Sequence, residues 1–170
     1  GSRAGGGGMS LSIRSATRND VSTILRFVEE LAAFEKAPAG AVKATPERLH
    51  DALFGEHAVA EALIAEWNGE PAAFALFFHN FSTWEGRKGL YLEDLYVGEA
   101  KRGHGIGSAL LKRLAEIAVE RDCPRFEWVV LDWNESAIRV YEHIGAKMQP
   151  EWRVMRMEGD ALTGFAGTAR

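Results

Sequence analysis

Two adjacent stretches decide the fold of this chain: Leu90-Tyr91-Leu92-Glu93-Asp94-Leu95-Tyr96-Val97, and then Arg102-Gly103-His104-Gly105-Ile106-Gly107. The first has the composition of a strand, and the second places three glycines at alternate positions before a helix. Glycines let backbone N–H groups converge without obstruction by side chains. At a helix N-terminus these donors favour an anion, and Lys101 and Arg102 add positive charge. The pattern predicts a cradle for a pyrophosphate.

A plain glycine-rich connection before a helix is the alternative interpretation of this loop. Other nucleotide motifs fit it worse. A Rossmann fingerprint needs glycine at position 108, which is Ser108. A Walker A loop needs Gly-Lys-Ser or Gly-Lys-Thr after four intervening residues, and the sequence contains neither.

The rest of the chain supplies alternating strand and helix patterns around this centre. The predicted strands are residues 11–15, 60–67, 72–79, 89–97 and 126–131, with a final hairpin of 147–149 and 152–157. The predicted helices follow Thr17, Thr45, the break at residues 103–107 and Asn134, and the last of them ends at a Gly145 cap. Asn68-Gly69 predicts a tight hairpin turn, residues 81–88 a loop, and residues 159–170 a frayed end. The order predicts one mixed α/β sheet with helices on both sides.

Length and composition favour an ordinary globular protein. Residues 1–8 have the appearance of a tag or flexible leader, and residues 9–170 are expected to form a single domain. The net charge of −4 argues weakly against a nucleic-acid partner. Cys123 is the only cysteine, which excludes an intrachain disulfide and favours a reducing, cytoplasmic location. We also expect no membrane span, because no apolar run approaches about 20 residues, and no metal, because the histidines lack ligand spacing.

The pattern Arg-x-x-Gly-x-Gly between a strand and a long helix resembles the acyl-CoA signature of the GNAT superfamily of N-acetyltransferases. Residues 91–94, 132–134 and 140–146 further resemble the diamine (spermidine/spermine) N-acetyltransferase family, and residues 130–134 resemble its thialysine-acetylating branch. The likeness covers nearly all of residues 11–157. It implies the GNAT fold, a central mixed, mostly antiparallel sheet of about seven strands with helices on both faces. It also implies acetyl-CoA as co-substrate and a homodimer.

The resemblance assigns roles to individual residues. The cofactor set, which would hold the pantetheine arm and the pyrophosphate, is Leu95, Tyr96, Val97, Arg102, Gly103, His104, Gly105, Ile106, Gly107, Asn134 and Ala137. The set that would contact the amine substrate is Phe34, Glu35, Trp84, Glu93, Asp94, Glu151 and Trp152. The two residues with catalytic roles would be Tyr141, as general acid, and Glu93.

Three departures from the family pattern bear on the substrate. Ser82 stands where relatives often carry an aspartate, Phe34 replaces a tyrosine, and the segment leading to Trp152 is shortened. A long polycation needs several spaced acidic partners to offset desolvation of its ammonium groups. We therefore expect a short, thialysine-like amino acid to be preferred over spermine, with Arg153 or Lys36 available to its carboxylate.

Each catalytic group has an expected role in the transfer of the acetyl group. An alkylammonium has a pKa of about 10.4, so the site must take its proton, directly to Glu93 or through water. A backbone N–H near Val97 would meet the charge that develops on the thioester oxygen. Tyr141 would protonate the leaving thiolate, although a tyrosine on an apolar helix stripe often only packs. Since Glu93 and Asp94 are neighbours in a strand, at most one is expected to point to a given face.

The sequence is compatible with three functions. The leading one is an N-acetyltransferase that transfers acetyl from acetyl-CoA to the primary amine of a small molecule. The second is a protein N-terminal or lysine acetyltransferase on the same fold. The third is a non-catalytic acyl-CoA sensor, against which the presence of both Glu93 and Tyr141 argues.

Overall fold

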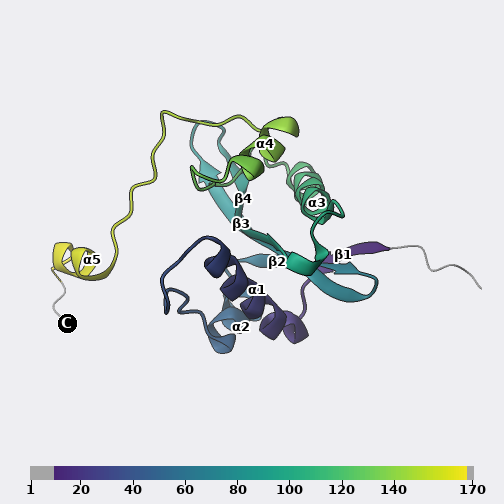
Figure 1. The fold of residues 1–170 in the computed structure, drawn as a ribbon. Coiled ribbons are helices and arrows are strands. Elements are labelled where there is room, and N and C mark those ends of the chain that lie inside the picture. The colour runs from purple at the N-terminus through teal and green to yellow at the C-terminus, as the bar shows by residue number, and fades with distance from the viewer. Residues whose placement is uncertain (1–9, 168–170) are drawn as a thin grey trace, which may run out of the picture. The chain divides into compact units, whose positions relative to one another are not determined.

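A computed structural model of the chain describes residues 10–167 (Figure 1). Contacts divide it into two compact units, one ending at Val129 and the other beginning at Val130. The predicted leader, residues 1–8, lies outside the described residues.

The elements follow the predicted order closely through the first unit. In chain order they are β1 (Leu11–Ser15), η1 (Arg18–Asp20), α1 (Val21–Phe34), α2 (Pro46–Phe54), β2 (Glu61–Trp67), β3 (Glu70–Ser82), β4 (Arg87–Val97), η2 (Glu99–Lys101), α3 (Ile106–Glu120) and β5 (Phe126–Glu127). The second unit holds α4 (Glu135–His143) and α5 (Gly159–Phe165).

The sheet has five strands in the described part of the chain, in the order β1-β2-β3-β4-β5. The first four pair antiparallel with their neighbours, and β5 pairs parallel to β4. The sheet is therefore mixed and mostly antiparallel, as predicted, but the expected count of about seven is not found.

Two predicted segments account for the difference in strand count. The strand expected over residues 126–131 is limited to Phe126–Glu127, and residues 147–149 and 152–157 form no strand. A strand needs a neighbour for its backbone groups and for one face. Trp152, Val154, Met155 and Met157 are 50–89% exposed, so their alternating pattern alone does not place them in a sheet.

Helices cover both faces of the sheet in the first unit (Figure 1). On one face, apolar side chains of α1, α2 and the central strands form the cluster Ile24, Phe27, Leu53, Ala62, Ile64, Phe74 and Tyr96. The buried residues of α3 lie against β2, β3 and β4 on the other face, and they include Ile106, Leu110, Leu114 and Ile117. Successive side chains of β4 therefore point to opposite faces of the sheet, with Tyr96 toward α1 and Val97 toward α3.

Local signals in the sequence explain where these elements begin and turn. The Thr45 hydroxyl accepts a hydrogen bond of 3.2 Å from the Arg48 N–H and caps α2. The Thr17 N–H donates to the Asp20 carboxylate at 2.7 Å, which starts the segment leading into α1. Asn68 has a φ of 52°, as the tight β2–β3 hairpin turn requires.

Two other expectations are corrected. The β3–β4 hairpin is longer than predicted, because Phe81↔Lys88 and Ser82↔Arg87 pair across it and leave a short turn in place of the loop 81–88. The end of the chain was expected to fray from residue 159, but Gly159–Phe165 form α5. Asp160 lies in the first turn of α5, where a carboxylate complements the helix dipole.

Candidate functional site

The glycine loop before α3 has the conformation that the cradle requires. Gly103 and Gly105 have φ values of +87° and +73°, in a region that side chains rarely adopt, although a Cβ there would meet no atom within 4 Å. Gly105 occupies the N-cap of α3 and has no side chain to bond the first-turn N–H groups. These donors are therefore available to an anion, so the loop fits the pyrophosphate of an acyl-CoA.

An aromatic pair fixes this loop to the sheet. The imidazole of His104 stacks on the indole of Trp67, with ring centroids 4.5 Å apart and planes 20° apart. Trp67 ends β2 beside the Asn68-Gly69 turn. The sequence did not predict this contact, because the two residues lie 37 positions apart and only the pairing of β2, β3 and β4 brings them together.

One edge of β4 is open over the part that would receive the pantetheine arm. On the side away from β3, β4 pairs only with β5, at Leu90 and Tyr91. Within residues 10–167, no strand pairs with that side beyond Tyr91. The backbone of Leu95, Tyr96 and Val97 therefore lies on a sheet edge that an extended amide-bearing chain can pair with.

A β-bulge occurs where the acidic residues of β4 lie. Leu76 pairs with Asp94 while Phe77 pairs with Leu92, so Glu93 is the extra residue and has no opposite partner. In a regular strand, side chains alternate between the two faces, and the prediction of at most one of these carboxylates on each face rested on that alternation. The bulge interrupts it. Glu93 is exposed and Asp94 is half-buried.

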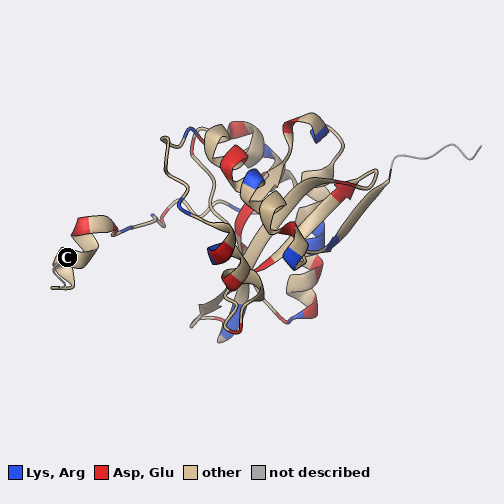
Figure 2. Ribbon diagram, turned by 90° about the horizontal axis from the view of Figure 1, so that it is seen from below, with Lys and Arg blue, Asp and Glu red and all other residues tan. Residues whose placement is uncertain are grey.

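Two carboxylates act on the carboxyl group of Asp94 near the end of α1. Burial raises the pKa of Asp94, the charges of Glu93 and Glu35 add to that rise, and together they bring it to about 6. Burial also raises the pKa of Glu35, which follows the last residue of α1. Glu35 and Glu93 therefore lie near enough to Asp94 for their charges to act on it, in a setting that favours a cation. Elsewhere in the chain, acidic and basic residues are interspersed (Figure 2).

Trp84 lies far from this carboxylate cluster along the same hairpin. It occupies the β3–β4 turn and is 81% exposed. Asp94 lies seven positions after Arg87, the first residue of β4, and at about 3.3 Å per position the two are about 20 Å apart. One chain therefore does not bring Trp84 to the predicted amine site.

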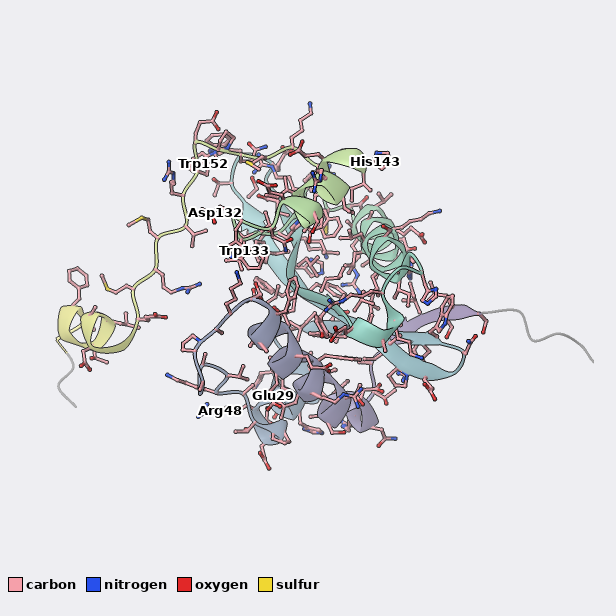
Figure 3. All side chains as sticks on the ribbon, viewed as in Figure 1. Glu29, Arg48, Asp132, Trp133, His143 and Trp152 are labelled. Atoms are coloured by element: carbon pink, nitrogen blue, oxygen red, sulfur yellow. The ribbon has the colours of Figure 1, made fainter. Side chains whose placement is uncertain are left out.

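The remaining predicted residues belong to the second unit. The Asn134 side chain accepts a 3.4 Å hydrogen bond from the Ala137 N–H and caps α4. Tyr141 lies within this helix, which ends near Gly145 with a φ of +102°, as expected. Glu151 lies in a turn after α4, and Trp152, which follows it, is 70% exposed (Figure 3).

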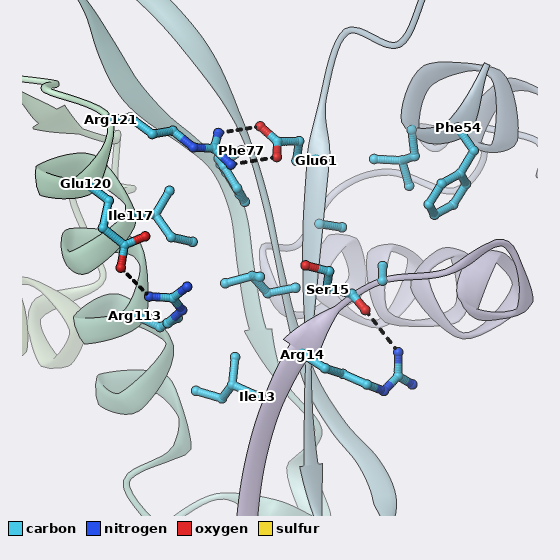
Figure 4. A pocket seen from close by; sticks show the side chains of 14 residues that line it. Ile13, Arg14, Ser15, Phe54, Glu61, Phe77, Arg113, Ile117, Glu120 and Arg121 are labelled. Atoms are coloured by element: carbon cyan, nitrogen blue, oxygen red, sulfur yellow. Dashed lines mark hydrogen bonds and ion pairs between the residues drawn. The ribbon is translucent and has the colours of Figure 1, made fainter. Parts of the chain in front are cut away.

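A separate pocket of about 420 Å³ opens between α3 and the β1–β2 side of the sheet (Figure 4). Arg121 makes a two-pronged ion pair with Glu61 there, at 2.6 and 2.9 Å. The pocket is lined by residues such as Ile13, Phe77 and Ile117, and none of the residues predicted for the site lines it. It is therefore not the predicted amine or cofactor site.

Comparison with known proteins decides the family. The sequence model of the acetyltransferase (GNAT) family matches residues 25–146. The chain belongs to this family. The thialysine N-ε-acetyltransferase of Sus scrofa is 40% identical over 169 residues, covering 93% of this chain and 98% of that protein. The thialysine N-ε-acetyltransferase of Caenorhabditis elegans is 35% identical over 157 residues, covering 91% and 96%.

Solved structures agree with this assignment. An integron cassette protein from the mobile metagenome of V. cholerae superposes with a TM-score of 0.77 and 28% identity, over 95% of this chain and all of that chain. The predicted α/β GNAT fold is thus confirmed. So is the prediction of an acetyl-CoA-dependent N-acetyltransferase that modifies a small-molecule amine.

Over residues 10–167, no helix is long and apolar enough to cross a membrane. In the same part of the chain, no group of three or more His, Cys, Asp or Glu side chains is arranged to hold a metal ion.

Proposed function

We propose that this GNAT enzyme acetylates the side-chain amine of a short amino acid such as thialysine. The observation that carries the proposal is the cluster of Glu35, Glu93 and Asp94, which offers negative charge to one amino group at the end of α1. The family members of highest identity reported above are thialysine N-ε-acetyltransferases. Ser82, on the hairpin, supplies no further carboxylate for a long polyamine.

The carboxylates of β4 would bind the ammonium group and take its proton. Asp94, with a pKa of about 6, is better matched to proton transfer near neutral pH than an ordinary carboxylate. Glu93 is exposed at the bulge, so it can pass a proton to solvent, directly or through water. We therefore assign removal of the proton to the pair, with Asp94 nearer the amine and Glu93 nearer the solvent.

The glycine loop and the open edge of β4 would hold acetyl-CoA, which supplies the acetyl group when it is bound. The first-turn N–H groups of α3 would receive the pyrophosphate, and the backbone of residues 95–97 would pair with the pantetheine arm. The Val97 N–H would stabilise negative charge on the thioester oxygen. Asn134 and Ala137 would contact the cofactor arm from α4, and Tyr141 would donate a proton to the thiolate.

We also propose a cytoplasmic homodimer in which residues 9–170 act as one N-acetyltransferase domain. The exposed apolar segment around Trp152 is one candidate contact, since large apolar patches mark interfaces. The distance of about 20 Å along β4 is a second argument, because Trp84 can approach an amine site only in another copy of the chain. Light scattering at assay concentration and at tenfold higher concentration tests this state, and a monomer at both would overturn it.

A panel of amines tests the proposed substrate. Release of CoA is followed with thialysine, lysine, ornithine, putrescine, spermidine and spermine. We expect thialysine or another short amino acid to exceed spermine in kcat/KM by about tenfold, as expected for the loss of one carboxylate contact worth about 1.4 kcal/mol. A tenfold preference for spermine would reverse the ranking. Acetylation only of added proteins, seen by intact mass, would favour the protein acetyltransferase instead.

A further inference from the structure

The side chain of Arg102 makes contacts that a simple phosphate ligand does not need. Its guanidinium carbon lies 5.3 Å from the centre of the Phe34 ring and 5.5 Å from the centre of the Tyr96 ring. Its Nε donates a hydrogen bond of 3.2 Å to the Val97 carbonyl. Arg102 is thus attached to β4 and, at the same time, to the end of α1.

These contacts join the cofactor loop to the carboxylate cluster. Phe34 is the last residue of α1, and Glu35 follows it directly. The charge of Glu35 is one of the causes that raise the pKa of Asp94, so the end of α1 and this part of β4 must stay close for the cluster to exist. On the inner side, Phe27 of α1 already contacts Tyr96, with ring centres 5.9 Å apart. Arg102 holds the outer side of the same junction.

A guanidinium that lies over aromatic rings, an arrangement called the stack below, can still bind an anion. Its N–H groups lie in its own plane, so the terminal ones can donate to an anion while the cation–π contacts persist. An arginine beside Gly103 and Gly105 therefore can contact a pyrophosphate without leaving the rings. A pyrophosphate bound there would restrict the motion of the guanidinium. Through the stack it would also restrict the motion of Phe34 at the end of α1.

We propose that Arg102 is a positioning residue that couples acetyl-CoA binding to amine binding through its stack on Phe34. The bound cofactor holds Arg102 in place, Arg102 holds Phe34, and Glu35 is kept beside Asp94. The expected consequence is that the amine binds more tightly when the cofactor is present, and this consequence rests on the proposed function. By linkage, the amine tightens cofactor binding by the same factor.

The test measures the end of α1 itself, so it needs no amine and no turnover. Hydrogen exchange is followed at the Glu35, Lys36 and Ala37 amides, which bond to carbonyls of the last turn at 2.9, 3.1 and 2.9 Å. We expect saturating CoA to slow their exchange by about 5-fold or more, the lower end of common coupling energies. In Phe34→Leu, which removes the ring but keeps an apolar side chain, CoA should leave their exchange unchanged.

Two further variants separate the stack from general effects. Phe34→Tyr keeps a ring and should restore the slowing by CoA. Phe81→Leu makes the same substitution at another exposed phenylalanine, 67% exposed on β3, and should behave as the wild type. Calorimetry should show that all four proteins bind CoA with a Kd within about 3-fold of one another, since the backbone cradle is unchanged.

The outcomes distinguish this inference from the proposed function. The coupling is overturned if CoA slows hydrogen exchange equally in the wild type and in Phe34→Leu. It is also overturned if CoA does not slow exchange in the wild type, whatever the amine panel shows. If the coupling is present and no short amine is acetylated, the substrate proposal fails and the role of Arg102 stands. Thialysine binding to Phe34→Leu gives a further check. If its affinity for thialysine falls by the same factor with and without CoA, Phe34 is only a contact of the amine, and the proposed coupling is overturned.

Discussion

The substitution Asp94→Asn should make the protein more stable while it lowers its activity. The carboxyl group of Asp94 has an ordinary pKa of 3.8, which burial and the neighbouring carboxylates raise to about 6 in the folded protein. A difference of about 2 pKa units corresponds to about 3 kcal/mol. Because the folded state holds this proton more tightly, stability falls as the pH rises from about 4 to 6 and stays lower above that range.

The expected gain therefore depends on pH. Asparagine carries no charge at any pH, so Asp94→Asn should raise the free energy of unfolding by about 1–3 kcal/mol at pH 8 and by nearly nothing at pH 4. The lower figure allows for the new amide N–H groups, which need partners in a half-buried position. Urea unfolding followed by circular dichroism at pH 8, 6 and 4 measures the difference.

Asp20→Asn is the matched control, with the same chemical change and the opposite sign. The Asp20 carboxylate pairs with Arg14 at 2.7 and 2.9 Å, which lowers its pKa to about 2. Its contribution is present above about pH 4 and is lost as the pH falls toward 2, so this variant should lose about 2 kcal/mol at pH 8. A gain for Asp94→Asn that is equal at pH 8 and pH 4, or a loss at pH 8, would refute the electrostatic reasoning.

Three other predictions concern catalysis, the cradle and the dimer. Tyr141→Phe should lower turnover by about 10²-fold while acetyl-CoA affinity changes little, and an unchanged turnover number where chemistry is rate-limiting would assign Tyr141 to packing. Gly105→Val should abolish acetyl-CoA binding in calorimetry, whereas Gly86→Val, the same change at a φ of +67° in the β3–β4 turn, should retain it. If Trp84 serves a second copy, mixed Trp84→Ala and Tyr141→Phe protomers should recover about a quarter of wild-type activity, and no recovery would place both residues in one chain.

The parts of the fold that depend on local signals were predictable from the sequence. Thr45 before Pro46 marks the start of α2, and Asn68-Gly69 marks the β2–β3 turn, because capping and φ preferences act within a few residues. The glycine loop was predictable for the same reason. Its alternating glycines and its place before an amphipathic helix specify a backbone shape as well as a composition.

The parts that depend on distant partners were not predictable. The bulge at Glu93 arises from the register between β3 and β4, and no residue type in the strand signals it. The segment around Val154 alternates like a strand, yet a strand exists only where a neighbour accepts its hydrogen bonds. The raised pKa of Asp94 likewise needs the end of α1 beside β4, which sequence spacing cannot show.

The structure suggests why the site is assembled on a strong local core. Glu93 is unpaired in the bulge, Asp94 carries a charge in a half-buried position, and the outer edge of β4 beyond Tyr91 lacks a strand partner in the described residues. Each of these features costs stability in the absence of ligands. Directly beside them, Tyr96 and Phe27 join the main apolar cluster, which offsets that cost. A bound cofactor that pairs with the edge would restore part of the lost stability, because a ligand specific for the folded state stabilises it by about 2.7 kcal/mol at 100 times its Kd. The features that lower the stability of the protein are therefore the ones that its substrates would contact.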